Sequence, residues 1–187
     1  AIQGCSAINL ALGQTVQEVY LEPAGWRVAT NSTTFMAQQV IDTRPPPSSL
    51  VQQSTLIQSF LGVEILFDQP TDIDVTQVEL MTDMRLLDGE FCFTYLLPLS
   101  AQQLLVEVTV FAKTRPTQAD LQIELDKLLH KRGWAHAHIV RTEYGNLPMG
   151  LPNGAPSTSP QPIRAGMAGG ALRPSSGYGF LRIQRWA

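Results

Sequence analysis

One acidic residue, Glu107, lies in an otherwise uncharged and largely apolar stretch, residues 103–112. If the stretch is a β-strand, alternation gives Glu107 the same face as Leu105, Thr109 and Phe111. A carboxyl group among such neighbours loses solvation when it ionises, so its pKa should rise and it should stay protonated near neutral pH. A general acid requires that state. The same pattern also fits a half-solvated sheet on which Glu107 faces water.

A second candidate for chemistry is the segment 166–180, which contains five glycines and one proline just before an amphipathic tail, residues 181–186. Glycines let a backbone approach a ligand closely, and a helix N-terminus offers unpaired N–H groups at its positive end. Together they predict a binding site for an electron-rich group. The spacing is not that of a P-loop or of G-x-G-x-x-G, and tight packing is the alternative explanation.

Consecutive strands are predicted to position these residues. Two strands surround the Pro-Gly turn at 22–25, a third covers residues 35–42, and the proline run at 45–49 ends regular structure. A hairpin turn is predicted at 87–90 and a looser one at 98–101. Further strands are predicted at 55–67, 76–85, 91–97, 103–112 and 137–144. Such short spacing favours an antiparallel sheet.

A helix is predicted before the last strand. Thr117 suits the N-cap, with Asp120 in the capping-box position, and Gly133 suits the end of the helix. Residues 150–162, rich in Pro, Ser and Gly, are predicted to form a flexible loop. The apolar stripe of the helix comprises Leu121, Leu125, Leu128 and Leu129.

The composition limits the possible partners. Charged residues make up only 16% of the chain, against about 25% in average proteins, which suggests a surface partly covered by a partner, a membrane or further protein. A formal charge of −3 argues against nucleic-acid binding. Cys5 and Cys92 do not indicate a disulfide framework, so a reducing cytoplasm fits. No apolar run is long enough to span a bilayer, although peripheral membrane contact is compatible with the sequence.

Seven short motifs occur in one order along the chain. Residues 40–46 contain Asp-x-Arg-Pro, 58–65 contain Phe-x-Gly-Val-Glu, 105–109 read Leu-Val-Glu-Val-Thr, and 173–180 read Arg-Pro-Ser-Ser-Gly-Tyr-Gly-Phe, with further matches at 81–85, 95–100 and 143–149. In this order the motifs resemble those of the flavin-dependent lycopene cyclases. The chain departs from that pattern at Val63, where tryptophan is usual, and at Val108, where many members carry a second acid.

The resemblance implies an α+β fold. An antiparallel substrate-binding sheet with a covering helix is expected at 47–144. Remnants of a Rossmann-like FAD-binding domain, as in p-hydroxybenzoate-hydroxylase-like flavoproteins, are expected at 1–46 and 145–187. The Gly-rich fingerprint that grips a dinucleotide is missing, as is the C-terminal part, so the sequence is interpreted as an internal fragment of a longer protein and is expected to be inactive alone.

The resemblance also implies an activity, the acid-catalysed cyclisation of the ends of lycopene or a related linear carotenoid by an isomerase (intramolecular lyase). Glu107 would donate the proton, alone or with a more distant partner, and Asp83 is a secondary catalytic candidate for orienting it. Reduced FAD, with NAD(P)H as reductant, would stabilise the cation without net oxidation, helped by aromatic faces of Phe91, Phe93, Tyr95 or Phe111. The implied flavin contacts are Arg44, Gly169, Gly170, Pro174, Ser175, Ser176, Gly177 and Tyr178.

Other interpretations stay open at this point. Asp83 and Arg85 are predicted to form a structural ion pair, and Arg44 fits a loop salt bridge as well as a flavin contact. His136 and His138 fit surface histidines better than metal ligands, so no metal site is expected. The alternative functions are an FAD-dependent monooxygenase or oxidoreductase and a non-catalytic module that binds an apolar ligand. The expected location is the cytoplasm, with peripheral membrane association.

Overall fold

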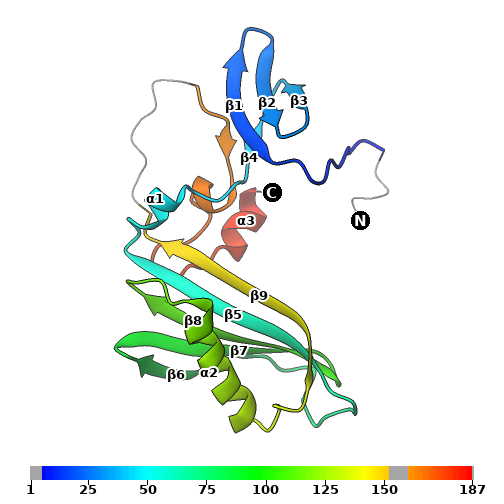
Figure 1. Ribbon diagram of the computed structural model, residues 1–187, viewed down its shortest axis with the longest axis vertical. Helices are drawn as coiled ribbons and strands as arrows, with labels where there is room; N and C mark the ends of the chain where they lie inside the picture. The colour runs from blue at the N-terminus through cyan, green and yellow to red at the C-terminus, as the bar shows by residue number, and fades with distance from the viewer. Residues whose placement is uncertain (1–5, 152–159, 187) are drawn as a thin grey trace. The chain divides into compact units, whose positions relative to one another are not determined.

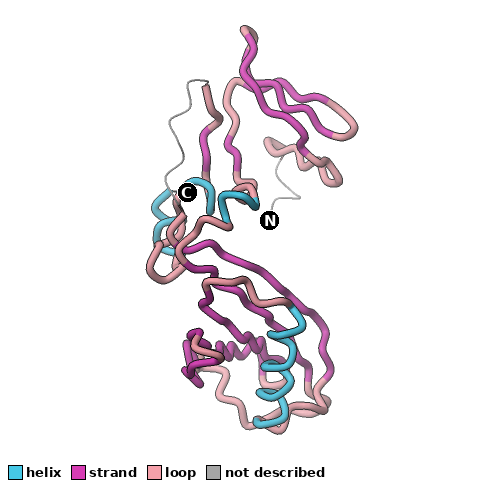
Figure 2. Tube along the Cα trace, turned by 60° about the vertical axis from the view of Figure 1, so that its left-hand side comes forward, coloured by secondary structure: helices cyan, strands magenta, loops and turns pink. Residues whose placement is uncertain are grey.

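The computed structural model describes residues 6–151 and 160–186. The chain divides into two units, one made of Ala1–Pro45 with Asn153–Ala171 and the other of Pro46–Pro152 with Leu172–Ala187. Figures 1 and 2 show the elements of each unit.

The first unit contains a small antiparallel sheet of β1 (Val16–Glu22), β2 (Gly25–Thr30) and β3 (Thr34–Ala37). The two strands predicted around the Pro-Gly turn are confirmed. The single strand predicted at 35–42 is wrong, because β3 ends at Ala37 and β4 covers only Ile41–Asp42. β4 pairs in parallel with β10 (Ile163–Arg164), which a short 3-10 helix, η2 (Gly166–Gly169), follows.

The second unit contains a five-stranded antiparallel sheet in the order β6-β7-β8-β5-β9. Its strands are β5 (Leu56–Leu66), β6 (Glu79–Leu87), β7 (Glu90–Ser100), β8 (Gln103–Ala112) and β9 (His138–Met149). The helices are α1 (Ser48–Val51), α2 (Gln118–Lys131) and α3 (Phe180–Trp186). The loose turn predicted at 98–101 is wrong at its start, because β7 continues through Ser100 before a turn at Ala101 and Gln102. The predicted hairpin turn at 87–90 is confirmed, with Asp88 and Gly89 both at positive φ.

The hydrophobic core lies between one face of this sheet and α2 (Figure 1). The predicted capping box begins α2: the Asp120 N–H donates to Thr117 Oγ1 at 3.2 Å, and the Thr117 N–H donates to Asp120 Oδ2 at 2.9 Å. The whole predicted leucine stripe is buried. Residues such as Leu61, Val106 and Val108 meet it from the sheet. Burial of each such side chain contributes about 1.5–3 kcal/mol, so this layer fixes which face of the sheet points away from α2.

Candidate functional site

Glu107 lies on the side of the five-stranded sheet opposite α2. Its strand neighbours Val106 and Val108 are fully buried in the core beneath the helix, so alternation sends the Glu107 side chain the other way. We call this side the Glu107 face. Its members, identified by cross-strand register, include Gln58, Phe60, Gly62, Glu64, Phe91, Phe93, Tyr95, Leu97, Leu105, Glu107, Thr109, Phe111, Arg141, Glu143, Gly145 and Leu147.

The Glu107 carboxyl is partly buried, and its surroundings favour the neutral form. Burial raises the pKa of this carboxyl, the hydrogen bond from Thr109 opposes that rise, and the nearby negative charge of Glu143 adds to it. The expected rise in the pKa is therefore confirmed, and the alternative in which Glu107 faces open water is wrong. A carboxyl group whose pKa is raised in this way is better suited to donate a proton than an ordinary glutamate is.

An aromatic cluster lies beside Glu107 on the same face. Phe93 is fully buried and packs edge-to-face on Tyr95 and Phe111, with ring centroids 5.3 and 5.2 Å away. Phe91 lies 5.6 Å from Phe93 and 6.0 Å from Phe111. Tyr95 is directly opposite Glu107 on the neighbouring strand. Burial, and then the charge of Glu107, raise the pKa of the Tyr95 phenol, so the phenol stays neutral beside the acid.

Glu143 is a member of this face that the sequence did not single out. In the register of the sheet, Glu107 on β8 and Glu143 on β9 stand on either side of Gly62 on β5. A Cβ added to Gly62 would lie 3.2 Å from Glu143 Cγ and 3.6 Å from Glu107 Cβ. The missing side chain of Gly62 therefore leaves the two glutamates as neighbours across β5. Only the pairing of β5 with both β8 and β9 reveals this.

Val108 occupies the position where many lycopene cyclases carry a second acid. It is 0% exposed and contributes to the core beneath α2. Because neighbouring residues in a strand point to opposite faces, a carboxyl group at 108 would not share the Glu107 face. Glu64 and Glu143 are acids that do share it, and Glu143 stands opposite Gly62, as Glu107 does.

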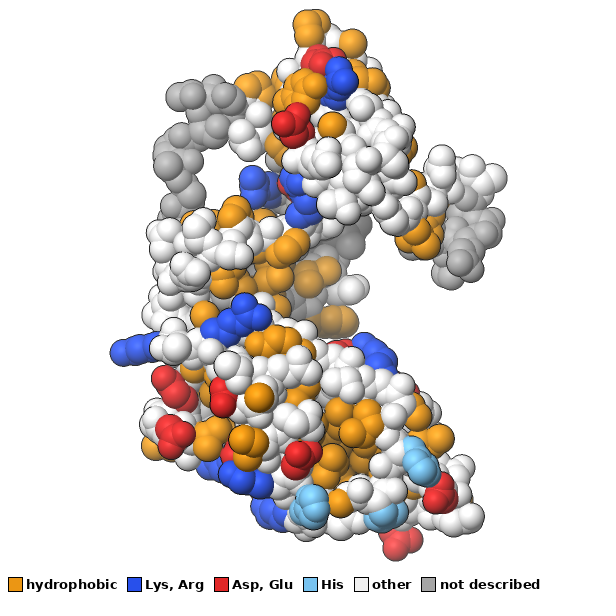
Figure 3. All heavy atoms as spheres, viewed as in Figure 1, with side chains coloured by type: hydrophobic (Ala, Val, Ile, Leu, Met, Phe, Trp, Pro, Cys, Tyr) orange, Lys and Arg blue, Asp and Glu red, His pale blue; other side chains and the backbone are white. Residues whose placement is uncertain are grey.

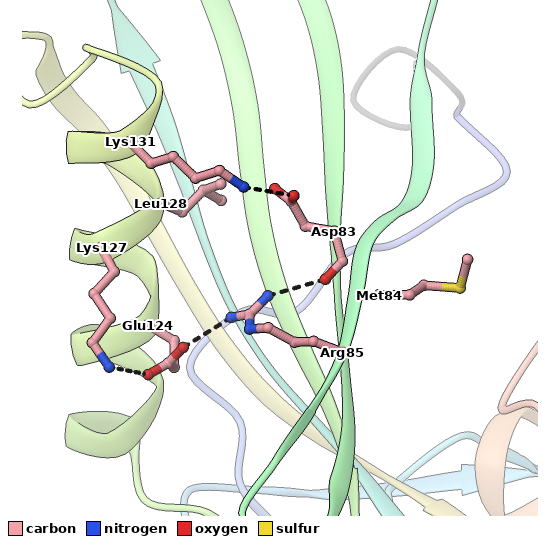
Figure 4. Close-up of a pocket in the computed structure, with 7 residues that line it drawn as sticks. All are labelled: Asp83, Met84, Arg85, Glu124, Lys127, Leu128 and Lys131. Carbon is pink, nitrogen blue, oxygen red and sulfur yellow. Dashed lines mark hydrogen bonds and ion pairs between the residues drawn. The ribbon is translucent and has the colours of Figure 1, made fainter.

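Asp83 forms an ion pair with α2 and does not lie near Glu107. It lies on the edge strand β6, two strands from β8, and its Oδ1 forms an ion pair of 2.8 Å with Lys131 (Figure 4). The hydrogen bond from Lys131 is the main cause that lowers the pKa of Asp83.

The predicted ion pair between Asp83 and Arg85 is wrong. Arg85 pairs with Glu124 of α2 at 2.8 Å and donates to the backbone oxygen of Asp83 at 3.1 Å. Asp83 and Arg85, with Glu124, Lys127, Lys131 and two apolar residues, line a pocket of about 300 Å³. The charged groups of this pocket pair with one another (Figure 4), which indicates a structural link between β6 and the helix.

Arg44, an expected flavin contact, forms a salt bridge within the first unit. Its Nε and Nη2 donate to Oδ1 and Oδ2 of Asp42, both at 2.9 Å. This bidentate hydrogen bonding lowers the pKa of Asp42, whose side chain is nearly buried. The loop salt bridge predicted as the alternative is therefore present.

The Gly-rich segment folds as two separate turns, one in each unit. Gly169 closes η2 because a Cβ there would lie 2.5 Å from the Arg164 carbonyl oxygen, and Gly170 follows in the left-handed conformation at φ 78°. In the second unit, Gly177 adopts φ 66°, and its N–H donates to the Arg173 oxygen at 2.8 Å.

The second turn leaves polar and aromatic groups at the surface. Pro174, Ser175, Ser176 and Tyr178 are exposed there, while Gly177 is buried against Gln58. The tail predicted as amphipathic is α3, which begins at Phe180.

Further expectations concern metals, membranes and thiols. Within residues 6–151 and 160–186, no group of three or more His, Cys, Asp and Glu side chains could hold a metal ion, and His138 lies 3.2 Å from Asp68. In the same part of the chain no helix is both long and apolar enough to cross a membrane. Cys92 is a buried free thiol, and Cys5 lies outside the described residues.

Large apolar side chains are also exposed on the edge strand β6, where Leu80, Met84 and Leu86 are more than half exposed. Figure 3 shows exposed hydrophobic side chains on the visible surface of the molecule, interspersed with charged ones.

The chain is similar to known proteins in sequence and in fold. A family model described as lycopene cyclase protein matches residues 5–187. A lycopene beta-cyclase of Pseudescherichia vulneris is 33% identical over 176 residues, which cover 91% of this chain and 44% of that protein. A solved structure, a geranylgeranyl bacteriochlorophyll reductase-like protein from Thermoplasma acidophilum, matches with a TM-score of 0.59 and 16% identity over 89% of this chain and 44% of that chain. This last likeness concerns the fold, a mixed α/β architecture with antiparallel sheets. The chain spans less than half the length of either relative.

Proposed function

The chain belongs to the lycopene cyclase family, and from this premise we propose that it carries the proton donor for cyclisation of the ends of lycopene or a related linear carotenoid. The observation that carries the proposal is the partly buried Glu107 carboxyl, whose pKa is raised by burial on an aromatic face of the sheet. Because the chain spans 44% of its curated relative, the activity is proposed for the complete protein that contains this sequence.

Glu107 begins the proposed reaction as a neutral acid. One carboxyl oxygen accepts the hydrogen bond from Thr109, and the other holds the proton, which it transfers to a terminal carbon–carbon double bond of the polyene. The resulting tertiary cation is attacked by an inner double bond, which closes a six-membered ring. Loss of a proton from the ring then gives the cyclic end group, so the substrate is isomerised without net oxidation.

The aromatic cluster supports the cationic stage of this reaction. Ring faces attract a cation by about 0.5–2 kcal/mol, most strongly where water is excluded. Phe91, Tyr95 and Phe111 surround the buried Phe93 on the face that Glu107 shares. These rings would also present an apolar surface to the hydrocarbon.

A flavin is part of the proposal, and the second turn is the proposed contact for one edge of its ring system. The buried, left-handed Gly177 closes the turn and leaves Pro174, Ser175, Ser176 and Tyr178 exposed to hold the ring system. When bound in its reduced form, FAD would supply negative charge that stabilises a nearby cation, with NAD(P)H as the reductant. In the first unit, Arg44, Gly169 and Gly170 are further proposed contacts, which would make this unit part of a flavin-binding domain.

The proposed location is the cytoplasmic surface of a membrane, because a linear carotenoid dissolves in lipid and must be drawn from it. The exposed apolar side chains of β6, Leu80, Met84 and Leu86, support a peripheral contact.

The proposal is tested with the full-length protein carrying Glu107→Gln in cells that accumulate lycopene. Glutamine keeps the size of the side chain but cannot donate the proton, so cyclic product should fall about 10²–10⁴-fold. Glu79→Gln is the control, because Glu79 lies on the edge strand β6 of the same sheet, two strands from Glu107, and pairs with Arg132 at 2.8 Å. Undiminished cyclic product from Glu107→Gln would end the assignment of Glu107 as donor.

A further inference from the structure

Two glutamates of the Glu107 face have different surroundings although they are neighbours. Glu107 and Glu143 stand on either side of Gly62, and a Cβ at Gly62 would lie 3.4 Å from Glu143 Oε1. The two side chains therefore border the same gap on the sheet. The negative charge of Glu143 also contributes to the raised pKa of Glu107, as this proximity requires.

Glu143 is held by a cation, whereas the hydrogen bond to Glu107 comes from a neutral hydroxyl. The Arg141 guanidinium forms an ion pair with Glu143 Oε2, and the Glu143 side chain is 31% exposed. Arg141 also lies 3.9 Å from Glu64, whose Oε1 accepts a hydrogen bond from Gln103 Nε2. Arg141 is thus anchored between the side chains of Glu64 and Glu143, and Glu143 is positioned by a charge-assisted ion pair.

Cyclisation requires a proton acceptor as well as a donor. The proton that leaves the ring comes from a different carbon than the one that received the proton from Glu107. Two titratable groups in contrasting environments commonly divide the acid and base roles between them. Glu107 and Glu143 have this contrast, and they lie side by side on one face of the sheet.

We propose that Glu143 is a second catalytic residue, the base that removes the ring proton from the cyclised cation. This inference rests on the cyclase function proposed above and deepens it. In the step, the C–H bond of the ring breaks, its electron pair forms the ring double bond, and the proton goes to the Glu143 carboxylate. Glu107 ends the cycle ionised and Glu143 neutral, and transfer of one proton from Glu143 to Glu107 restores the starting state without an oxidant or reductant.

The test uses the full-length protein with reduced FAD and lycopene in lipid vesicles, in D₂O. Two quantities are measured for the wild type and for Glu143→Gln: the amount of cyclic product, and the deuterium gained by the linear lycopene that is recovered. Glu107→Gln, Glu143→Asp and the control Glu79→Gln are measured alongside. Deuterium in linear lycopene reports proton delivery by Glu107 followed by return of the cation to the linear form.

We expect Glu143→Gln to lower cyclic product about 10²-fold while deuterium still enters linear lycopene, because delivery by Glu107 continues when the base is absent. Glu143→Asp, which keeps a carboxylate, should recover part of the cyclic product. Glu79→Gln should behave as the wild type does.

Two results would overturn the role of Glu143 and leave the cyclase proposal intact. One is wild-type cyclic product from Glu143→Gln. The other is a parallel loss of cyclic product and of deuterium exchange in that variant, since this indicates a structural role. Other results would contradict the cyclase proposal itself. These are a wild-type protein that forms no deuterated cyclic product, or a Glu107→Gln variant that forms as much cyclic product as the wild type.

Discussion

Thr109 Oγ1 donates a hydrogen bond of 2.8 Å to Oε1 of Glu107, two residues earlier on the same strand face. Thr109 is fully buried, so this hydrogen bond holds the carboxyl in one orientation on the sheet. The two residues form the Glu-x-Thr part of the motif that resembles lycopene cyclases. Their spacing of two residues places both side chains on the same face of the strand, where this hydrogen bond can form.

Thr109→Val should shift the pH dependence of cyclisation. The hydrogen bond from Thr109 lowers the pKa of Glu107, so its removal raises that pKa further. A donor acts only while it is protonated, and activity falls as pH rises through the pKa. The alkaline limb of the pH–rate profile should therefore move to higher pH, with a stability loss of about 1 kcal/mol. Thr109→Ser keeps the hydroxyl and should leave the limb in place. An alkaline limb that stays in place in Thr109→Val would contradict the account.

Glu107→Gln should also change how stability depends on pH. Burial raises the pKa of Glu107 in the folded protein above its ordinary value of 4.5. The stabilisation linked to its proton is therefore complete below the unfolded pKa and is lost as pH rises through the folded one. The melting temperature of Glu107→Gln minus that of the wild type should thus increase from acidic to mildly alkaline pH. Thermal unfolding at several pH values checks this, and a constant difference would argue against the raised pKa.

Gly62→Ala should impair cyclisation more than stability. The added Cβ would lie 3.2 Å from Glu143 Cγ, tight enough to push that partly exposed side chain aside by a few tenths of an ångström. Because the Glu143 side chain has room to move, we expect a change in unfolding free energy of no more than about 1 kcal/mol. Cyclic product and chemical denaturation are measured on the same preparation. A variant with full activity would show that the gap at Gly62 has no part in the reaction.

Gly177→Ala should weaken the binding of FAD. Gly177 adopts φ 66°, a left-handed conformation that strains alanine, and a Cβ there would displace the end of the Gln58 side chain, so the turn is destabilised. Fluorescence titration of the full-length protein with FAD should show at least about a tenfold rise in Kd, which corresponds to about 1.4 kcal/mol. Ser32→Ala, in the hairpin turn of the first unit, serves as a control. Equal affinity in Gly177→Ala and wild type would remove this turn from the flavin site.

The features predicted correctly from the sequence are those determined locally. Strand β8 has the predicted bounds, because the alternation of apolar residues around Glu107 is itself the strand signal. Helix α2 begins as predicted because Thr117 and Asp120 satisfy each other's backbone N–H groups. The raised pKa of Glu107 follows from the same alternation, since its neighbours on the strand are apolar.

The features that the sequence did not reveal depend on pairings between distant segments. Glu143 becomes a neighbour of Glu107 only because β5 lies between β8 and β9 and has Gly62 at that position. Asp83 was assigned the wrong ion-pair partner because β6 is irregular: Met81 and Asp83 have positive φ, and the register shifts on both sides of Thr82. Strict alternation does not hold through such bulges, so Asp83 reaches Lys131 of α2.

The central claim is that Glu107 holds a proton at neutral pH on the aromatic face of the sheet. Infrared spectroscopy measures this directly, because a protonated carboxyl group absorbs at a frequency distinct from that of a carboxylate. The difference spectrum between the wild type and Glu107→Gln at neutral pH should contain the band of one protonated carboxyl group, and this band should disappear as pH rises through the pKa of Glu107. A difference spectrum that contains only carboxylate bands at neutral pH would contradict the account.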